Sequence, residues 1–383
     1  MTRRGDPARF TSSQTGTLTK LRFSDTASRL HGIDTTGYER PSTGAGRQIM
    51  ADGRKWVTMG DVAARAGVGK ITVSRALRTP SKVSPATLRK VQAAVDELGY
   101  VLDETAGALS SQRSRVVGAL VSTLEEAVFA ATVRGLTEGL AKGGLQLMLS
   151  TTQYDPEAEA ALLPTMLGRR PEALVLTSDD HTEAAHRMLS RSGLPVLELW
   201  ELPKQPVHAA VGFSNRAAGA ALTRHMVETG RHRVAFLGLD RQHDRRARLR
   251  MEGYRDCAGH LASERVVAVK ARPGAVGPDY GAEGLAEILR RWPDTEAVVC
   301  VSDMVAMGAL CEARRRGLDV PGRLAISGFG DFDMAQDSAL ALTTIHIDGA
   351  AIGRRAAELI LAGDIPRGLR EDMGFSLVRR ATT

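Results

Sequence analysis

The sequence contains few cysteines, and they are not spaced as a metal site or a disulfide scaffold requires. Cys257, Cys300 and Cys311 are an odd number and form no CxxC motif. Zinc sites and disulfide-stabilised domains use paired or clustered cysteines. The composition therefore argues against both classes and fits a protein of the reducing cytoplasm.

Long apolar runs are also missing. No window approaches the roughly 20 consecutive apolar residues that a membrane-spanning helix needs. The chain begins with the polar, basic sequence MTRRGDPARFTSSQTGTLTKLRF, which contains no apolar core of a secretory signal. We therefore expect a cytoplasmic protein that does not use a membrane as a partner.

Motifs of the common enzyme classes do not stand out either. There is no GxGxxG after an expected strand, no Walker A motif, no GxSxG elbow and no acid pair at a mechanistic spacing. The histidines form no HxxxH or HxH pair. The sequence therefore predicts no catalytic residues, no metal site and no cofactor.

The net charge of +7 is concentrated near the N-terminus. Residues 1–50 carry a net charge of +4 and residues 51–112 carry +3, whereas residues 113–383 contain 34 basic and 34 acidic side chains. A basic segment ahead of a neutral body suggests a polyanion-binding head. We expect residues 1–55 to form a disordered basic extension, which is either a solvated tail or an arm that adds nonspecific DNA affinity.

Residues 56–102 show helical periodicity interrupted by tight breaks. The expected elements are a helix that ends at Ala66, a turn at Gly67-Val68-Gly69, a second helix over 71–77, and a third helix from Pro85 to Leu98. Ser84 and Pro85 are typical of a helix start and Gly99 of a helix end. Two short helices joined by a glycine-containing turn predict a helix-turn-helix, with a helical bundle that has a solvated basic face as the alternative.

The second helix of such a motif lies in the major groove of DNA, with side chains near its start at the base edges. Arg75 and Lys70 can contact guanine acceptors, and Ile71 can pack on a thymine methyl group. The side chains better suited to phosphates are Thr72, Arg78, Ser84 and Thr87.

From residue 115 to residue 383 the sequence alternates β-rich runs with helical stretches. The expected strands are 116–122, 145–151, 172–178, 194–200, 208–214, 233–239, 266–269, 296–302, 324–330 and 342–348, and the expected helices include 128–144, 159–170, 216–230 and 281–292. This alternation predicts doubly wound parallel sheets, and the length predicts two lobes. Ligands of such folds bind at the carboxyl ends of the strands, so we expect a site in a cleft between the lobes.

Several runs resemble those of a known family. The headpiece contains DVAARAGVGKITVSRAL followed by VSPATLRKVQAAVDELGY, and the body contains VRGLTEGLAKGG, VETGRHRVAFLG, RMEGYRDC, VSDMVAMGAL and LAISGFGDFD in that order. Together they resemble the lactose-repressor family of bacterial transcription regulators over residues 58–380. The resemblance implies a small all-α helix-turn-helix headpiece and an α/β bilobal, periplasmic-binding-protein-like effector domain with two doubly wound parallel sheets. It also implies a homodimer on a palindromic double-stranded DNA operator, switched by a small molecule in the cleft.

The same resemblance assigns roles to individual residues of the DNA-binding part. Lys70, Ile71 and Arg75 fall on base-contacting positions, and Thr72, Ser74, Arg78, Ser84 and Thr87 fall on phosphate-contacting positions. Residues 103–114 correspond to the hinge helix, in which Leu109 falls on the lever that wedges into the minor groove. The hinge departs from the family pattern because it contains Asp103, Glu104 and Gly107, so Leu109 could instead be an ordinary apolar residue of a linker.

In the body, the runs QPVHAAVGFSN, LELWELP, LTSDDHT and ISGFGDFD are similar to the gluconate-operon repressor branch of the family. This similarity implies a sugar acid such as gluconate, or its phosphate, as the effector. Arg250 falls where the family places an arginine that reaches the ligand, although neighbouring arginines leave open a solvated basic helix. The other residues expected to line the cleft are Ser122, Thr123, Phe129, His181, Asn215, Ser302 and Asp303, with an exposed loop position as the alternative for His181.

Two other classes compete with a ligand-responsive repressor of carbohydrate catabolic genes. A periplasmic solute-binding protein shares the two-lobed body, but it would need an export signal and no helix-turn-helix. An α/β sugar-processing enzyme would need one of the catalytic motifs that do not stand out. The regulator is therefore the preferred interpretation.

Overall fold

The computed structural model describes residues 56–102, 114–258, 264–272, 277–336 and 340–383. It divides into two compact units, Met1–Leu102 and Asp103–Thr383, which we call the headpiece and the body. The predicted basic extension of residues 1–55 and the predicted lever Leu109 lie outside the described residues.

The headpiece consists of short helices with well-defined ends. These are α1 (Met59–Ala66), α2 (Lys70–Arg78), the 3₁₀ turn η1 (Pro80–Lys82) and α3 (Pro85–Leu98). Gly67 ends α1 and Gly99 ends α3, both in the left-handed conformation that favours glycine. The hydroxyl of Ser84 accepts a hydrogen bond from the backbone N–H of Thr87 at the start of α3. The predicted helix-turn-helix and its capping residues are therefore present.

The body alternates strands and helices along most of its length. The strands are β1 (Val116–Val121), β2 (Gln146–Thr151), β3 (Ala173–Leu176), β4 (Val196–Leu199), β5 (Ala209–Gly212), β6 (Val234–Asp240), β7 (Val266–Lys270), β8 (Ala297–Cys300), β9 (Ala325–Ser327), β10 (Thr344–His346), β11 (Leu369–Asp372) and β12 (Ser376–Val378). The helices are α5 (Ala127–Ala141), α6 (Pro156–Gly168), α7 (Glu183–Arg191), α8 (Asn215–Glu228), α9 (Arg245–Ala258), α10 (Gly277–Arg291), α11 (Asp303–Arg315), α12 (Asp333–Gln336) and α13 (Gly349–Ala362).

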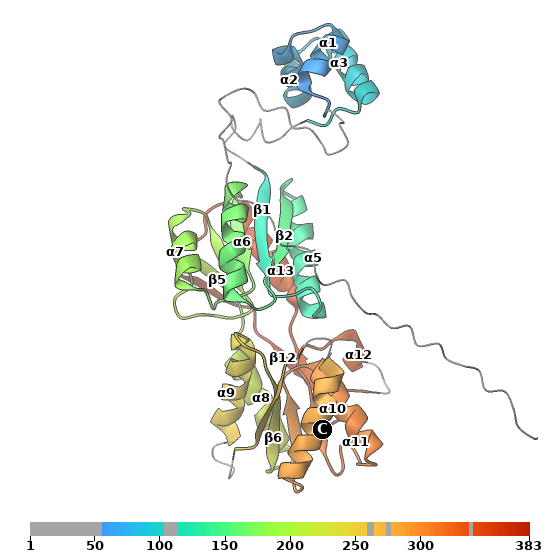
Figure 1. Ribbon diagram of the computed structural model, residues 1–383, viewed down its shortest axis with the longest axis vertical. Coiled ribbons are helices and arrows are strands. Elements are labelled where there is room, and N and C mark those ends of the chain that lie inside the picture. Colours follow the sequence, from blue (N-terminus) through green and yellow to red (C-terminus); the bar gives the residue numbers. More distant parts are fainter. Residues whose placement is uncertain (1–55, 103–113, 259–263, 273–276, 337–339) are drawn as a thin grey trace, which may run out of the picture. The chain divides into compact units, whose positions relative to one another are not determined.

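Two parallel sheets organise the body into two lobes (Figure 1). The first lobe contains a six-stranded sheet of order β11-β5-β4-β3-β1-β2, and the second contains a four-stranded sheet of order β7-β6-β8-β9. A short antiparallel pair, β10 and β12, continues the second lobe. The described chain leaves the first lobe after β5, returns after β10 and crosses again after β11. The predicted α/β bilobal fold is confirmed.

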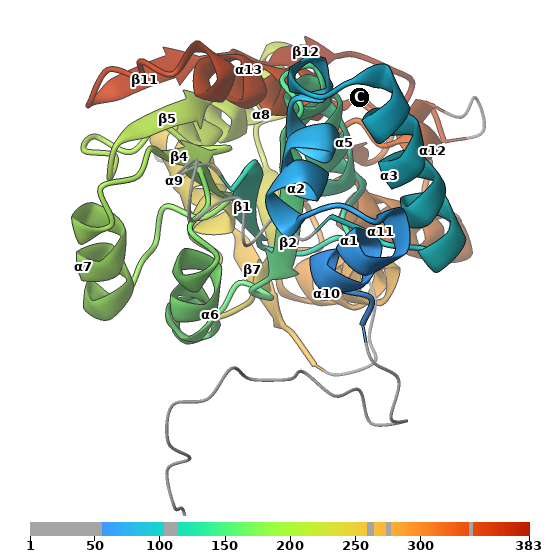
Figure 2. The same ribbon diagram turned by 90° about the horizontal axis from the view of Figure 1, so that it is seen from above.

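Helices cover both faces of each sheet. In the first lobe, α5 and α13 lie on one face and α6 and α7 on the other (Figures 1 and 2). Successive side chains of β1 point to opposite faces, so Val117 and Ala119 pack into the core with α5, whereas Leu120 packs with Leu163 of α6. In the second lobe, α8 and α9 pack together on one side and α10 and α11 on the other.

The ten predicted strands are all present, and the structure adds β11 and β12. The sequence of β11, Leu-Arg-Glu-Asp, is mostly charged and only half-buried, and it pairs with β5 at the edge of the sheet. An edge strand of this composition has no apolar run to indicate it, which explains why the sequence did not predict it.

Glycines allow α5 and α13 to pack closely in the first lobe. A Cβ atom at Gly135 would overlap with the backbone of Ala350, and one at Gly353 would overlap with the carbonyl oxygen of Thr132. The same close approach brings the indole of Trp200 within 3.1 Å of a Cβ built at Gly349. The packing of these two helices therefore tolerates no side chain at either contact position.

We predict that Gly353→Ala lowers the free energy of unfolding by about 1–3 kcal/mol, because the new methyl group must force the two helices apart. Urea unfolding of the full chain, followed by circular dichroism, measures this change. Gly168→Ala is the matched control, since a Cβ at this helical position meets no described atom within 4 Å. The control should be neutral or slightly stabilising, and equal losses in both variants would contradict the close-packing argument.

Candidate functional site

The second helix of the headpiece has one buried and one exposed face. Val73 and Ala76 of α2 are buried in the headpiece core. Ile71 is 70% exposed, although globular proteins usually bury isoleucine. An exposed isoleucine beside basic side chains is a suitable surface for base edges, where it can contact a thymine methyl group.

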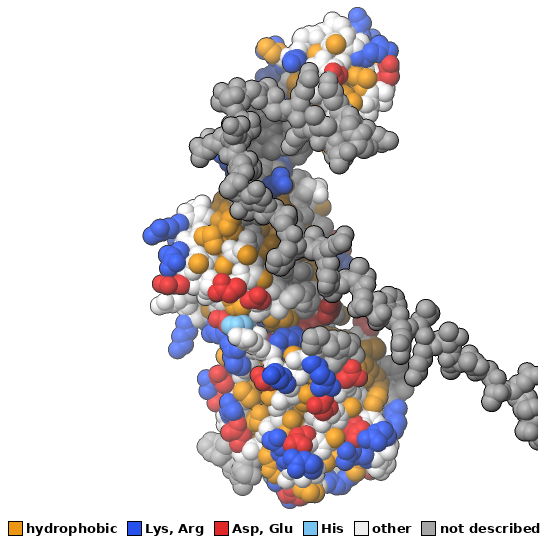
Figure 3. All heavy atoms as spheres, in the orientation of Figure 1, with side chains coloured by type: hydrophobic (Ala, Val, Ile, Leu, Met, Phe, Trp, Pro, Cys, Tyr) orange, Lys and Arg blue, Asp and Glu red, His pale blue; other side chains and the backbone are white. Residues whose placement is uncertain are grey.

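The residues predicted to contact DNA are accessible on this unit. Lys70, Ile71, Arg75, Arg78 and Ser84 are exposed, and Thr72, Ser74 and Thr87 are partly exposed. Gly60 leaves room for the stem of Lys70, since a Cβ atom there would lie 3.1 Å from the lysine Cε. Basic side chains lie on the surface of the headpiece in Figure 3, beside some acidic ones. The individual DNA contacts stay predictions.

In the body, Arg246 of α9 reaches from the second lobe into the first. Its guanidinium donates to the backbone carbonyl of Thr177 and, over 3.0 Å, to the hydroxyl of Ser122, which follow β3 and β1. The guanidinium also lies over the ring of Phe129, 4.8 Å from the centroid. Arg246 is only 7% exposed. The carboxyl ends of two strands of the first lobe therefore meet a buried cation of the second lobe.

Arg250 lies one helical turn further along α9 and faces a second ring. Its guanidinium donates to the carbonyl of Val301 over 2.9 Å and lies 4.1 Å from the ring centroid of Phe329. Burial lowers the pKa of Arg250; the charge of Asp244 acts in the opposite direction, and the charge of Arg246 acts in the same direction as burial. The charge of Arg250 is therefore held in a place that disfavours it.

An aromatic cluster connects the two arginines. The rings of Phe129, Trp200, Phe213 and Phe329 follow one another at centroid distances of 5.3–6.2 Å, and Phe375 packs on Phe213 at 6.3 Å. Phe129 belongs to the first lobe and Phe329 to the second. The cluster therefore forms an apolar wall at the crossing between the lobes, with a guanidinium on each end.

Neither guanidinium forms an ion pair with a carboxylate of the described residues; their partners are carbonyls, a hydroxyl and rings. Two like charges at i and i+4 repel each other. A buried charge without a counter-ion is costly, and structural sites normally avoid it. An incoming carboxylate or phosphate would relieve this cost, so the arrangement suits an anionic ligand.

Some of the other predicted ligand residues lie near this wall. Ser122 bonds to Arg246, and Phe129 lies under it, as described above. Asn215, at the start of α8, donates its amide to the carbonyl of Trp200 over 2.9 Å and to Glu201 over 2.8 Å. Its Oδ1 is buried and accepts no hydrogen bond from the described residues, so this oxygen has capacity for a ligand hydroxyl.

The remaining predicted residues are engaged in local structure. Thr123 accepts a hydrogen bond from the backbone N–H of Glu125. Ser302 caps α11. Asp303 is buried and accepts hydrogen bonds from the Thr344 hydroxyl over 2.6 Å and the Phe332 N–H over 2.8 Å. Burial raises the pKa of Asp303 to about 6, although both hydrogen bonds act in the opposite direction.

The structure places His181 in a role that the sequence did not indicate. Its two ring nitrogens lie 2.6 Å from Oε1 of Glu159 and 3.2 Å from Oε1 of Glu198, and all three side chains are buried within the first lobe. Burial alone would lower the pKa of His181, but the hydrogen bonds and charges of the two glutamates raise it to about 10. The exposed-loop alternative is therefore wrong, and no ring nitrogen is left for a ligand in this arrangement.

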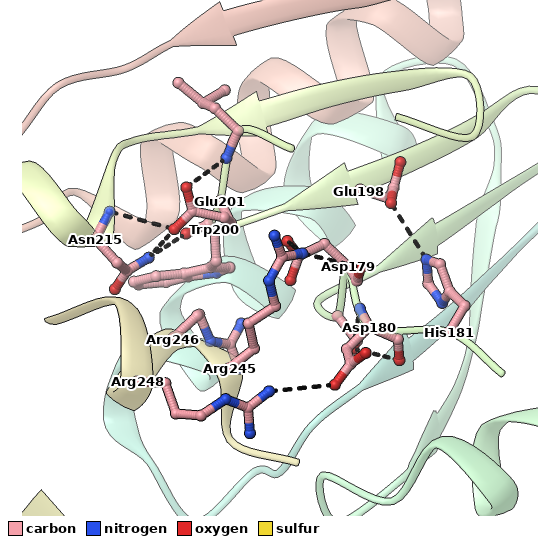
Figure 4. Close-up of polar contacts among 12 residues, drawn as sticks. Asp179, Asp180, His181, Glu198, Trp200, Glu201, Asn215, Arg245, Arg246 and Arg248 are labelled. Atoms are coloured by element: carbon pink, nitrogen blue, oxygen red, sulfur yellow. Dashed lines mark hydrogen bonds and ion pairs between the residues drawn. The ribbon is translucent and has the colours of Figure 1, made fainter. Parts of the chain in front are cut away.

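Sequence reasoning missed Arg246, which is less exposed than Arg250. It was one of several neighbouring arginines, and Arg245 and Arg248 instead pair with Asp179 and Asp180 (Figure 4). Helical spacing could have indicated Arg246, because residues 246 and 250 lie on the same face of a helix, whereas residues 245 and 248 lie on another face.

No three His, Cys, Asp or Glu side chains among the described residues are grouped so that they could hold a metal ion. No helix within the described ranges is long and apolar enough to cross a membrane.

A helix-turn-helix headpiece and a two-lobed body, with guanidiniums buried where the lobes meet, define a DNA-binding regulator that responds to a small molecule. Residues 58–103 match the family described as "Bacterial regulatory proteins, lacI family", and residues 114–370 match "Periplasmic binding proteins and sugar binding domain of LacI family". The chain belongs to the LacI family of transcriptional regulators.

Individual relatives support this assignment. The HTH-type transcriptional regulator GntR of Pseudomonas aeruginosa is 36% identical over 331 residues, which cover 85% of this chain and 95% of that protein. A solved LacI-family regulator from Silicibacter pomeroyi is 33% identical, with a TM-score of 0.79 and coverage of 85% of this chain and 99% of that one. A solved complex of the regulator CelR with cellobiose is 27% identical, with a TM-score of 0.61 and coverage of 85% and 100%.

The buried cluster of Glu159, His181 and Glu198 makes stability depend on pH. Because the pKa of His181 is raised above its ordinary value of 6.5, the protonated ring stabilises the folded state fully below pH 6.5. This contribution is lost as the pH rises through about 10. We predict that the difference in unfolding free energy between the wild type and His181→Gln decreases over this range.

Urea unfolding at a series of pH values from 6 to about 10 measures this difference. His186→Gln is the control, because His186 is an exposed histidine of the adjacent helix α7. The control should show a small difference at every pH. A difference for His181→Gln that stays constant with pH would show that the ring is not held as a cation.

Proposed function

We propose that this protein represses carbohydrate catabolic genes and responds to a sugar acid such as gluconate, or to its phosphate, in the cleft of the body. It binds a palindromic operator as a homodimer. Lys70, Ile71 and Arg75 read bases, and residues 103–114 form the hinge that carries the lever Leu109. The observation that carries the effector class is the pair of guanidiniums, Arg246 and Arg250, at the crossing between the lobes, neither of which forms an ion pair with a carboxylate of the described chain.

The two parts of a sugar acid, its anionic group and its hydroxyl groups, would contact different side chains. The carboxylate or phosphate is bound by the two guanidiniums, in charge-assisted hydrogen bonds that are stronger than neutral ones. Hydroxyl groups of the polyol chain donate to buried acceptors such as Oδ1 of Asn215. The ring of Trp200 supplies an apolar surface beside them.

Binding at this place acts on DNA through the arrangement of the lobes. Arg246 belongs to the second lobe and its partners Ser122 and Thr177 to the first, so a ligand at Arg246 contacts both lobes. A ligand shifts an equilibrium by as much as its affinity differs between the two states. Whichever lobe arrangement binds the anion more tightly is therefore the arrangement that the effector selects.

A neutral sugar is the second candidate for the effector. The CelR relative binds cellobiose, which has no anionic group, and it shares the fold of this chain. A neutral ligand would leave both guanidiniums without a counter-ion, however, and would gain less from them. The sugar acid is therefore the better fit to these side chains.

For the headpiece, we predict that Arg75→Ala reduces discrimination at one operator base pair by about 1–3 kcal/mol, because a bidentate contact with guanine is lost. Binding to a panel of single-substitution operators measures it. Arg290→Ala, in the body, is the control and should leave the preference unchanged. Equal weakening of Arg75→Ala on all sequences would indicate a phosphate contact instead.

For the cleft, we predict that gluconate or its phosphate raises the melting temperature of the full chain, since a ligand stabilises the state that binds it. Arg246→Met should weaken this ligand by at least about tenfold. The same variant should not lower the free energy of unfolding greatly, because an apolar side chain replaces a buried charge that lacks an ionic partner.

The matched control is Arg255→Met on the same helix, where the arginine pairs with Glu264 at the surface. It should bind the ligand as the wild type does. A melting temperature that rises only with neutral sugars, cellobiose among them, would contradict the sugar-acid effector. Calorimetric titration then gives the dissociation constants for each variant.

A further inference from the structure

The segment between β6 and the first turns of α9 makes ion pairs with the first lobe on both sides of Arg246. Arg241 lies 3.4 Å from Oε1 of Glu126, at the start of α5. Arg245 pairs with Asp179, and Arg248 lies 3.6 Å from Asp180. We call these six side chains the interlobe clasp.

The partners of the clasp in the first lobe are held in place by buried groups. Asp179 and Asp180 follow β3, and the next residue is His181, whose ring is fixed between two buried glutamates. The backbone N–H of Asp180 donates to the hydroxyl of Ser178, and Thr182 caps α7. The loop is therefore tied to the first lobe at each end, and its two carboxylates face α9 (Figure 4).

On the other side of Arg246, Glu126 is held by Tyr154. The phenol donates to Oε1 of Glu126 over 2.8 Å, and the guanidinium of Arg241 lies 4.7 Å from the ring centroid of Tyr154. Tyr154 has a backbone φ of 64° and Gln153 one of 53°, a conformation that is uncommon for residues other than glycine. The strained turn after β2 thus directs Tyr154 toward Arg241.

We propose that the interlobe clasp sets the balance between closed and open arrangements of the two lobes and thereby sets the affinity for the effector. This inference rests on the proposed function for the identity of the effector, but the clasp itself is defined by contacts within the protein. The clasp residues neutralise one another's charges. They therefore hold the lobes together without pairing with the guanidiniums of Arg246 and Arg250, which are proposed to bind the anion.

The charge arrangement favours this role over a purely structural one. Separation of the lobes would expose three acidic side chains on one lobe and three basic side chains on the other, which attract each other across the gap. Asp180 and Arg248 are 38% and 50% exposed, so their pairing is weak enough to be reversible. If the ligand binds only to the closed arrangement, its apparent affinity falls in proportion to the fraction of molecules that are closed.

A charge-exchange experiment on the exposed pair tests the proposal. Arg248→Glu places two acidic side chains opposite each other, and Asp180→Lys places two basic ones. Each single variant should raise the dissociation constant of gluconate about fivefold or more, which is the lower end of ordinary coupling between sites. The double variant restores opposite charges and should return to within about twofold of the wild type.

Hydrogen exchange of the full chain without effector gives a second readout. Peptides that cover residues 177–182 and 241–250 should exchange faster in each single variant and regain protection in the double variant. Asp256→Asn is the control, because it removes the Arg216–Asp256 pair between α8 and α9 within the second lobe. The control should change neither readout at the clasp.

The outcomes separate the clasp from the effector. Unchanged exchange in both single variants, or a double variant that fails to restore protection, would overturn the clasp. If exchange follows the charge pattern but neither gluconate nor its phosphate binds the wild type, the clasp is supported and the proposed effector class is wrong. If the ligand binds and the single variants bind it as tightly as the wild type, the clasp does not set effector affinity.

Discussion

The body of this regulator depends on a guanidinium that is buried where two lobes meet. Arg246 reaches from α9 to the carboxyl ends of β1 and β3, and it gains hydrogen bonds and a ring contact there but no counter-ion in the described chain. The position of Arg250 one turn away adds repulsion instead of relief. Burying two such charges costs stability at that point, and the proposed anionic effector would offset this cost.

The cations of the two units lie in different physical environments. On the headpiece, Lys70 and Arg75 are exposed and hydrated, so they suit a large polyanion whose binding is driven partly by counter-ion release. In the body, the cations are partly or fully withdrawn from water, where a single carboxylate or phosphate gains more from each contact. Residues 113–383 carry no net charge, which is consistent with this division.

The sequence was most informative where side-chain periodicity and local chemistry agree. Ser84 and Gly99 predicted both ends of α3 because capping depends on those residues alone. The strand β11 could not be predicted, since its pairing with β5 depends on a distant part of the chain and not on its own composition. His181 was ambiguous for the same reason: its partners Glu159 and Glu198 lie 22 and 17 residues away, and only the fold brings them together.

The basic residues of the clasp and the two arginines proposed to bind the effector lie on one segment, so effector binding and lobe arrangement can affect each other directly. Arg245 and Arg248 alternate along α9 with Arg246 and Arg250, so one short helix carries both the contacts that hold the lobes and the groups that face the cleft. A movement of α9 large enough to admit or release an anion must therefore also alter the clasp. The effector and the lobe arrangement can then be coupled without a chain of contacts through other elements, because both act on the same rigid helix.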